Sequence, residues 1–370
     1  IRAVVRKGKE RFVCDMRHAW RLEAVRDKKK NTEQRQALLS LKTHYDLDDV
    51  PGLSGFDRRQ VCVPQVCPRD CPQRSICRYH RYLREARSAE IFVQICNHNY
   101  LLADAAHRLQ ELHPLLNDYR ALVIDEAHKL PEAARQMYGQ SLSAQDFAEL
   151  CGLLAQEKQT LPAQRLRDKF RSLMSSLYRG ELLEDVQRTP FILTAEREAA
   201  LRDCLSLLRQ FQRQLSTKLP RWILYRLGTT EQALCLFCTG DRRYILYIQY
   251  DQAGSPSLCA ASRETPEQLC RALWQRRIPA ILTSGTLMAG NRFDRTEALI
   301  GLSTCQRLTH FAAASPFDYE ENCLLYIPGD RLCAPMGSGQ EIKELADQIC
   351  RLVEATHGHT LALFTSYSLM

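Results

Sequence analysis

Two adjacent carboxylates follow a short apolar run in the first half of the sequence. Ala121-Leu122-Val123-Ile124 is followed directly by Asp125-Glu126-Ala127-His128. A buried parallel strand delivers such residues at its C-terminal edge, where α/β sheets bind their ligands. Hydrolysis of a nucleoside triphosphate needs one carboxylate for Mg²⁺ and a second to polarise the attacking water. Asp125 is therefore the predicted metal residue and Glu126 the predicted base. The alternative is a helix N-terminus capped by Asp125.

Cysteines form a second group of residues that could do chemistry. The chain has 16 cysteines, and four of them lie close together in VCVPQVCPRDCPQRSIC, namely Cys62, Cys67, Cys71 and Cys77. Prolines exclude a regular helix there, and without an export signal a metal or cluster site is favoured over disulfides. The spacing Cys67-x3-Cys71-x5-Cys77 differs from the x2 knuckle of zinc ribbons, which favours an iron–sulfur site over zinc. Reduced thiols in a proline-rich loop are the alternative.

Positive charge is concentrated in the first quarter of the chain. Residues 1–100 hold 21 Lys and Arg against 12 Asp and Glu, whereas the whole chain carries a formal charge of +8. A basic excess confined to one segment indicates a polyanion, most often nucleic acid, although a solvated basic face has the same composition. Tyr79 and Tyr82 are expected to stack on bases of a single strand. The predicted phosphate contacts are Lys7, Lys9, Arg11, Arg69, Arg74, Arg78, Arg81, Arg84 and Arg87.

Apolar periodicity predicts the elements that carry these residues. Helical spacing of apolar residues over 141–218 predicts a helical insertion, whereas residues 231–250 alternate like strands. In a strand, Cys235 and Cys238 would point to opposite faces, so they are interpreted as core residues. Segment 336–341 lacks the Gly-Lys-Ser/Thr ending of a phosphate loop and is interpreted as a turn. Strands are expected at 3–5, 91–95, 121–124 and 280–282, and helices at 100–112 and 342–353.

Several motifs together resemble one known family. VIDEAH resembles motif II of the superfamily 2 helicases. Combined with the cysteine segment, CNHNYLLAD, ILTSGTL, SPFDY and LALFTSYSLM, all in the family's order, the chain resembles the DinG/XPD-like iron–sulfur helicases, and the bacterial DinG type in particular. The resemblance covers essentially all 370 residues, although the helical insertion matches only in position and character.

The resemblance implies roles for individual residues. It assigns Asp125, Glu126 and His128 to the site of ATP hydrolysis. Thr283-Ser284-Gly285-Thr286 resembles motif III, which couples hydrolysis to the DNA path, although a strand-to-loop turn would also explain it. Cys14 ends the segment GKERFVC, which matches an upstream part of the family pattern. The implied ligands of a [4Fe–4S] cluster are Cys14, Cys67, Cys71 and Cys77, with Cys62 as an alternative ligand.

The resemblance also implies a fold and a function. The fold is α/β: a RecA-like P-loop NTPase motor domain with an iron–sulfur loop insertion and a helical arch insertion, plus the start of a second RecA-like domain. The implied activity is that of an ATP-dependent 5′→3′ DNA helicase in repair or replication, with Mg²⁺, ATP and single-stranded or forked DNA as ligands. The expected parts are 1–20, 91–140 and 271–318 for the first motor domain, 21–90 for the cluster domain, 141–270 for the arch and 319–370 for the second motor domain.

Other possibilities remain open at this stage. The chain lacks a Gly-x-x-x-x-Gly-Lys-Ser/Thr loop, so we expect an internal fragment that is inactive alone. The alternatives are a nucleic-acid-binding module with a structural cysteine metal site and no productive ATPase, or a helicase-family exonuclease. Composition, with 45% hydrophobic and 25% charged residues, predicts a folded chain. Without a long apolar run or a signal peptide, we expect a cytoplasmic protein that does not span a membrane.

Overall fold

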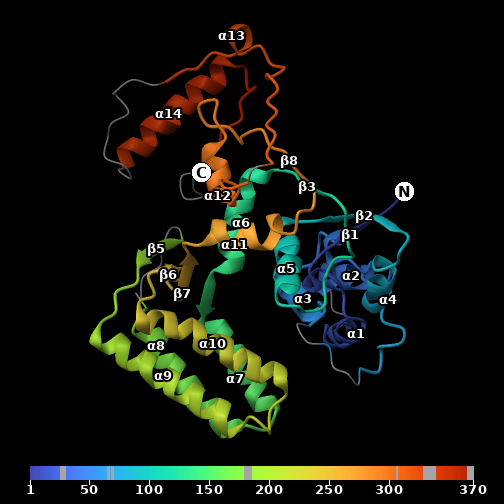
Figure 1. Cartoon of the computed structure of the whole chain (residues 1–370), viewed down its shortest axis with the longest axis vertical. Helices are drawn as coiled ribbons and strands as arrows, with labels where there is room; N and C mark the ends of the chain where they lie inside the picture. Colours follow the sequence, from blue (N-terminus) through green and yellow to red (C-terminus); the bar gives the residue numbers. More distant parts are fainter. Residues whose placement is uncertain are drawn as a thin grey trace. The chain divides into compact units, whose positions relative to one another are not determined.

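The chain folds into two units in a computed structural model (Figure 1). The structure describes residues 1–25, 31–64, 67, 71–178, 186–305, 307–327 and 339–364. Unit 1 comprises Ile1–Gln140, Arg243–Ile245 and Ala261–Thr304, and unit 2 comprises Ser141–Arg242, Leu246–Ala260 and Cys305–Met370. The first boundary coincides with the expected start of the helical insertion. Arg69 and residues 336–338 of the predicted turn lie outside the described residues, whereas residues 339–341 begin a helix instead of forming a turn.

Unit 1 contains two pairs of parallel strands. β1 (Arg2–Arg6) pairs with β2 (Ile91–Cys96), and β3 (Leu122–Ile124) pairs with β8 (Ala280–Leu282). Parallel partners need long crossover connections, and helices lie in sequence between the strands of each pair. The four strands expected in these segments are therefore confirmed, as is the mixed α/β character of the chain.

The expectation that β3 is buried throughout is wrong at its centre. Ile124 is buried, but Val123 is 65% exposed and its register partner Ile281 is 62% exposed. The two side chains share one face because they are directly paired. Parallel sheets are normally covered on both faces, so this face of the β3–β8 pair lacks an apolar cover among the described residues of unit 1.

Short helices surround the cysteine segment of unit 1. Apolar residues of the first three helices and their connections form one buried cluster, which includes Val13, Leu38, Leu47 and Val61. Among the described residues, the 3₁₀ turns Lys9–Arg11 and Leu47–Asp49 lie in this region, and Ala127–Lys129 follows β3. The helices near the cysteines are α1 (Asp15–Ala24), α2 (Thr32–Ser40), α3 (Gly55–Val61) and α4 (Arg78–Ala86).

The remaining helices of unit 1 pack near the strands. α5 (His98–Leu109) confirms the helix expected at 100–112, with its N-terminus two residues earlier. α6 (Leu130–Tyr138) contacts α5, α11 (Thr265–Leu269) and α12 (Asp294–Ile300). α11 continues into a π-helical turn over Cys270–Trp274.

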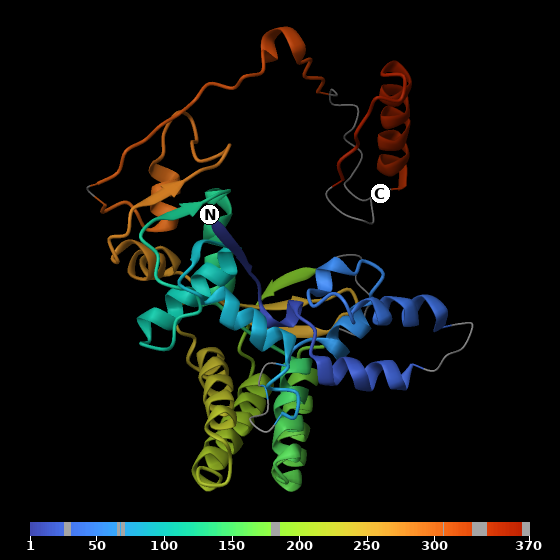
Figure 2. The same ribbon diagram turned by 90° about the vertical axis from the view of Figure 1, so that its right-hand side faces the viewer.

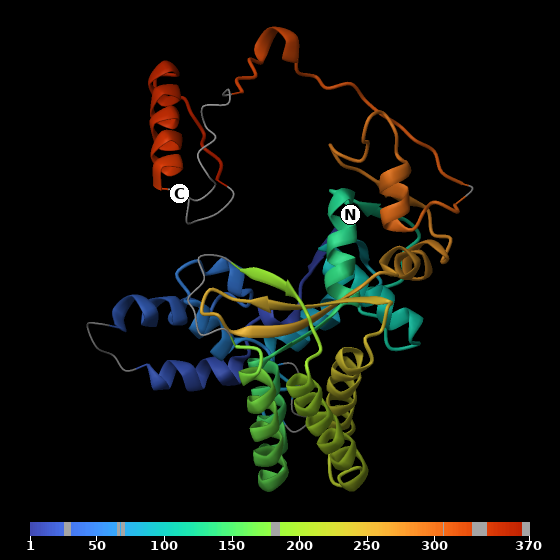
Figure 3. The same cartoon turned by 90° about the vertical axis from the view of Figure 1, so that its left-hand side faces the viewer.

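Unit 2 combines a small sheet with long helices. Its four-stranded sheet has the order β4–β7–β6–β5, and β5 runs antiparallel to β6. Figures 2 and 3 show the helices packed side by side and extending away from the sheet. Phe147 and Phe170 stack between α7 and α8 with ring centroids 4.0 Å apart. The elements are β4 (Gln140–Ser143), α7 (Ala144–Gln156), α8 (Thr160–Ser175), β5 (Gln187–Pro190), α9 (Ala195–Gln214), α10 (Arg221–Thr239), β6 (Tyr244–Tyr250) and β7 (Pro256–Ser262).

α10 corrects the strand expected over 231–250. Residues 231–239 are helical, and only Tyr244–Tyr250 forms a strand. Cys235 and Cys238 are therefore three residues apart on a helix and lie near one face. The pKa of Cys238 is raised by burial and, to a smaller extent, by the neighbouring Cys235. The prediction that strand geometry separates these two thiols is wrong.

The C-terminal part of unit 2 contains two more helices. α13 spans Tyr319–Asn322, and α14 (Gly339–Ala355) confirms the amphipathic helix expected at 342–353. No strand forms within 307–327 or 339–364, where we expected a further α/β unit to begin. Among the described residues, no helix has both the length and the apolar character needed to cross a membrane.

Candidate functional site

The adjacent acids and the hydroxyl-rich segment meet at the ends of β3 and β8. Ile124 is the register partner of Leu282, so the two chains leave the sheet side by side. The Thr283 N–H donates to the Ile124 carbonyl at 2.9 Å, and the Ala127 N–H donates to the Thr283 carbonyl at 3.0 Å. Backbone pairing thus continues beyond the strands and fixes the two loops against each other.

Asp125 is held as an ionised carboxylate. Its Oδ1 accepts from the Thr283 hydroxyl at 2.7 Å and from the Glu126 N–H at 3.0 Å. These hydrogen bonds, that from Thr283 foremost, lower the pKa of Asp125. No described residue bonds to Oδ2, so one charged oxygen is available to a cation.

His128 connects Glu126 to Ser284. Its Nδ1 lies 2.7 Å from the Ser284 Oγ and 3.1 Å from the Glu126 Oε2. The hydrogen bond therefore joins His128 to Ser284, with a direction set by the tautomer of the imidazole, whereas the contact with Glu126 becomes an ion pair when the imidazole is protonated. The Thr286 N–H also donates to the Ser284 Oγ at 3.1 Å. Between these residues, a side chain at Gly285 would meet no atom within 4 Å, so sterics do not require glycine there.

The backbone of Glu126 is strained. This residue adopts a left-handed conformation, with φ 48° and ψ 44°, which costs a non-glycine residue about 1–2 kcal/mol. Such conformations persist where surrounding contacts over-determine them, as at functional sites. One such contact comes from His98 at the start of α5, whose Nε2 donates to the Asp125 carbonyl at 2.9 Å. The Asn97 side chain caps α5 by accepting from the Tyr100 N–H.

Four of the five candidate cysteines influence one another electrostatically. Cys14 is the N-cap of α1 and Cys77 the N-cap of α4. Burial raises the pKa of Cys67, and the charges of Cys14, Cys77 and Cys71 raise it further. Burial also raises the pKa of Cys14, with a smaller contribution from Cys77. The charges of Cys14, Cys71 and Cys77 thus act on Cys67, and that of Cys77 acts on Cys14.

Cys62 lies in a different environment. Burial raises the pKa of this thiol, and the charged groups acting on it are Arg17 and Glu10. Its Sγ–H donates to the Arg59 carbonyl at 3.4 Å, and its carbonyl accepts from the Arg17 guanidinium at 2.9 Å. Within the described ranges, no three His, Cys, Asp or Glu side chains are already grouped tightly enough to hold a metal ion.

Three of the predicted phosphate contacts, Lys7, Arg11 and Arg78, are already in ion pairs. Lys7 contacts Asp46 and Asp48 at 2.5 and 3.2 Å, and Arg11 contacts Asp48 at 3.2 Å. Arg78 contacts Asp15 at 2.5 Å. Lys9 is half-buried, and Arg87 bonds to the imidazole of His113. The described part of the chain offers no ion-pair partner to three exposed arginines, Arg74, Arg81 and Arg84.

Tyr79 and Tyr82 belong to an aromatic cluster rather than to an exposed surface. Their rings lie 5.3 and 4.6 Å from that of Phe12, and the Tyr82 hydroxyl donates to the Val5 carbonyl at 2.6 Å. Burial raises the pKa of Tyr82 to about 12. The prediction that Tyr82 stacks on bases is wrong because its ring is buried. The spacing of Tyr79, Tyr82 and Ala86 is the signal for this buried helix face.

A buried charge network that our sequence reasoning missed supports the cysteine region. Asp57 on α3 is completely buried and accepts from Arg21 of α1 at 2.7 Å and from Gln34 of α2 at 2.8 Å. The Ser54 hydroxyl donates to it at 2.6 Å and accepts from its N–H at 3.1 Å. The network fixes α1 and α3, which carry Cys14 and Cys62 at their ends. The pattern Ser54-x-x-Asp57 is typical of a helix N-terminus and could have identified it.

Curated proteins similar to this chain are ATP-dependent DNA helicases, although no protein-family model matches it. ATP-dependent DNA helicase YoaA of Haemophilus influenzae is 26% identical over 329 residues, covering 81% of this chain and 48% of that protein. ATP-dependent helicase DinG of Mycobacterium tuberculosis is 25% identical over 336 residues, covering 87% of this chain and 49% of that protein. The chain thus spans about half the length of the curated relatives it matches. The expected resemblance to DinG-type helicases is confirmed.

Solved structures add a weaker likeness. The structure of S. tokodaii Xpd4 aligns with 55% of this chain and 42% of that chain, at 15% identity and a TM-score of 0.34. This value is too low to define the fold.

Proposed function

We propose that this chain is part of an ATP-dependent DNA helicase of the DinG type, which moves 5′→3′ on single-stranded or forked DNA in repair or replication. The observation that carries the proposal is the junction at the ends of β3 and β8, where Asp125 bonds Thr283 and His128 bonds Ser284, both at 2.7 Å. An ATP-driven motor needs its hydrolytic acids joined to a segment that responds to them, and this junction has both parts. The names of the similar helicases support the same function.

Each residue of the junction has a proposed role. Asp125 would hold Mg²⁺ through its available Oδ2, and the ion would neutralise charge on the phosphates. Glu126 would accept a proton from the attacking water. That proton would neutralise the carboxylate beside His128, which would weaken the attraction between these two side chains and leave the hydrogen bond to Ser284 as the main contact of the imidazole. Thr283, Ser284 and Thr286 would pass this change to the DNA path.

A [4Fe–4S] cluster on Cys14, Cys67, Cys71 and Cys77 is the second part of the proposal. The donor chemistry fits, because such a cluster takes four thiolates and these four thiols already interact electrostatically. Cys62 is the weaker alternative, since Arg17 and Glu10 rather than the other cysteines act on it. A bound cluster would relieve the repulsion among the thiolates and tie the N-caps of α1 and α4 to the proline-rich segment.

Unit 1 would then contain the first motor domain and the cluster domain, and the helices of unit 2 would form the arch-like insertion. Residues 319–370 would begin a second motor domain. Of the basic residues predicted to contact phosphates, we keep Arg74, Arg81 and Arg84 as the proposed DNA contacts of unit 1. Their side chains are exposed beside the cysteine segment. Arginines on one side of a helix can contact successive phosphates of a strand.

The test of the motor is Glu126→Gln in the full-length protein. We expect DNA-stimulated ATP hydrolysis to fall by about 10²–10⁴-fold while ATP binding persists, because the proton acceptor is lost but the charge on Asp125 remains. Glu132→Gln on α6, an exposed acid a few residues away, is the matched control. Hydrolysis that survives Glu126→Gln would remove this loop from the mechanism.

The cluster is tested by iron content and absorption after anaerobic purification. We expect about four irons per chain in the unaltered protein. Single Cys→Ser changes at positions 14, 67, 71 and 77 should each lower the iron content, whereas Cys62→Ser should leave it unchanged. Stoichiometric zinc without iron, or iron lost with Cys62 and retained without Cys14, would contradict this ligand set.

A further inference from the structure

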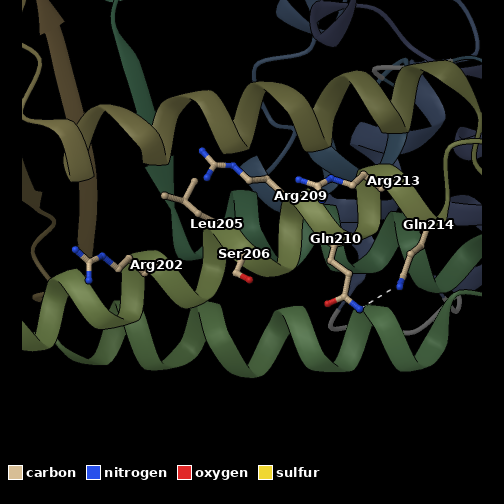
Figure 4. A pocket seen from close by; sticks show the side chains of 7 residues that line it. All are labelled: Arg202, Leu205, Ser206, Arg209, Gln210, Arg213 and Gln214. Carbon is tan, nitrogen blue, oxygen red and sulfur yellow. Dashed lines mark hydrogen bonds between the residues drawn. The ribbon is translucent and has the colours of Figure 1, made fainter.

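Three arginines form a row along α9 in unit 2 (Figure 4). Arg202, Arg209 and Arg213 are seven and four residues apart, so the helical repeat puts them on one stripe of the helix. They line an open depression with a volume of about 430 Å³, and Ser206, Gln210 and Gln214 supply its other polar side chains. Leu205 is the only apolar residue of the lining, and it is itself buried.

The row is only partly neutralised. Arg202 pairs with Glu198 on its own helix, and Arg209 pairs with Glu231 of α10 at 2.7 Å. The Arg202–Glu198 pair lies at the surface, where an ion pair typically contributes about 0–1 kcal/mol, whereas the Glu231 side chain is only 19% exposed. For Arg213 the described ranges contain no carboxylate partner.

Acidic residues are absent from the sequence that carries Arg209 and Arg213, whereas Glu198 and Asp203 lie beside Arg202. Residues 204–230, which include the second half of α9 and the first half of α10, contain no Asp or Glu. The basic residues of this stretch are Arg209, Arg213, Lys218, Arg221 and Arg226. Arg226 has Glu149 at 3.9 Å, and Tyr225 beside it is 67% exposed. An anion approaching this end of the helices therefore meets little opposing charge.

The composition of the surface favours nucleic acid over a protein partner. Protein interfaces bury apolar and aromatic anchors at their centres, and the α9 depression has no aromatic residue and only the buried Leu205 as an apolar one. Interfaces with nucleic acids are more polar and far more positive, and Arg, Ser and Gln are typical donors to phosphate and sugar oxygens. The helical rise of about 1.5 Å puts the arginines about 10 and 6 Å apart, which matches about three and two phosphates along a stacked strand at about 3.4 Å each.

We propose that the α9 row is a nucleic-acid-binding surface of unit 2, in which Arg202, Arg209 and Arg213 contact phosphates of one strand. The proposal rests on the charge and geometry of unit 2 and does not require ATP hydrolysis. It adds a contact separate from the exposed arginines near the cysteine segment. Stabilisation would come from phosphate contacts, without selection for base sequence.

The test measures binding of fluorescein-labelled oligothymidylate to the 370-residue chain by anisotropy, between about 50 and 200 mM salt. The triple variant Arg202→Gln/Arg209→Gln/Arg213→Gln removes the row and keeps polar side chains. For three lost phosphate contacts, the slope of log K against log salt should fall in magnitude by about 2. Arg165→Gln/Arg167→Gln/Arg171→Gln on α8 removes the same charge from unit 2 and should change the slope far less.

Further outcomes decide between the possible ligands. A photoreactive benzophenone at Gln210 should crosslink to the strand, whereas the same group at Gln164 on α8 should not. Equal slopes for the chain and the α9 variant, or no binding of the strand at all, would overturn the proposal. Poly-glutamate that binds as tightly as oligothymidylate, and loses as much in the α9 variant, would identify an acidic protein partner instead and equally overturn it. Circular dichroism of each variant verifies that the helices persist.

Discussion

Asp57 allows the most direct test of how the cysteine region is held together. This carboxylate is fully buried, and three side chains donate to it: Arg21 at 2.7 Å, Gln34 at 2.8 Å and Ser54 at 2.6 Å. Asp57→Asn preserves the shape of the side chain but removes the charge and one of its accepting oxygens. The amide nitrogen would then face donors that it cannot accept from.

The expected loss in the free energy of unfolding depends on which buried polar groups each variant leaves without a partner. Asp57→Ala removes one partner of a buried ion pair, which should lower the free energy of unfolding by about 3–5 kcal/mol. Asp57→Asn keeps one acceptor and should cost about 1.5–3 kcal/mol, the range for a hydrogen bond to a charged group. Asp49→Asn, a change at an exposed acid in the same region, should stay within about 0.5 kcal/mol of the unaltered chain.

The pH dependence gives an independent check. Burial alone would raise the pKa of Asp57, but the hydrogen bonds from Ser54, Gln34 and Arg21 outweigh burial and lower it below its usual value. The unfolded chain therefore binds this proton at a higher pH than the folded chain, so stability is lost as pH falls through the folded pKa. The stability difference between the unaltered chain and Asp57→Asn should be full at pH 7 and should narrow below about pH 4.

Urea unfolding followed by circular dichroism measures these differences at each pH. A difference that stays constant down to about pH 3 would show that the charge of Asp57 is not what the network stabilises. Equal stability of Asp57→Ala and Asp49→Asn at pH 7 would refute the reasoning altogether.

Three further predictions concern single side chains. Ser284→Ala in the full-length protein removes the oxygen that bonds His128, and strand displacement per ATP should fall by up to about tenfold while basal hydrolysis changes little; a parallel loss of both rates, measured together, would assign Ser284 to hydrolysis instead. Burial raises the pKa of Cys204 to about 12, so at pH 8 only about one in ten thousand of these thiols should be ionised, and mass spectrometry after iodoacetamide treatment should find Cys204 modified after the exposed Cys323. Tyr82→Phe leaves the Val5 carbonyl without its side-chain donor and should destabilise the chain by about 1–2 kcal/mol in urea unfolding, whereas a neutral result would mean that water replaces the hydroxyl.

The local sequence pattern predicted the strands of unit 1 because short apolar runs between polar segments are compatible with few other secondary structures. The same pattern misled for residues 231–239, where the continuous apolar run 233–238 lies within a helix that begins at Arg221. Length separates the two cases, since a helix can extend over 19 residues and a strand rarely does. The strand interpretation of residues 231–250 rested on the alternating residues near 244–248 and therefore missed the length of the helix before them.

The residues of the candidate site were predictable as types, but their contacts were not. Asp125 and Glu126 follow an apolar strand, and Thr283 and Ser284 follow another, so both segments could be identified separately. Their hydrogen bonds depend on the pairing of β3 with β8 in one register, which no local pattern specifies. Helical periodicity, in contrast, would have assigned Tyr82 to the buried face of α4 if the arginines had not drawn the interpretation to the exposed face.

The cysteine region combines supports of two kinds, and this bears on the order in which it forms. The Asp57 network and the ring of Phe12 packed on Tyr79 and Tyr82 hold α1, α3 and α4 through side chains alone. The thiols add repulsion when they ionise, because their charges raise one another's pKa. Folding of this part of unit 1 therefore does not require a metal or cluster, since side-chain contacts already position the helices that carry Cys14 and Cys77. Its binding free energy would instead overcome the repulsion among the thiolates, and a change in the metal would act first on the neighbouring Arg74.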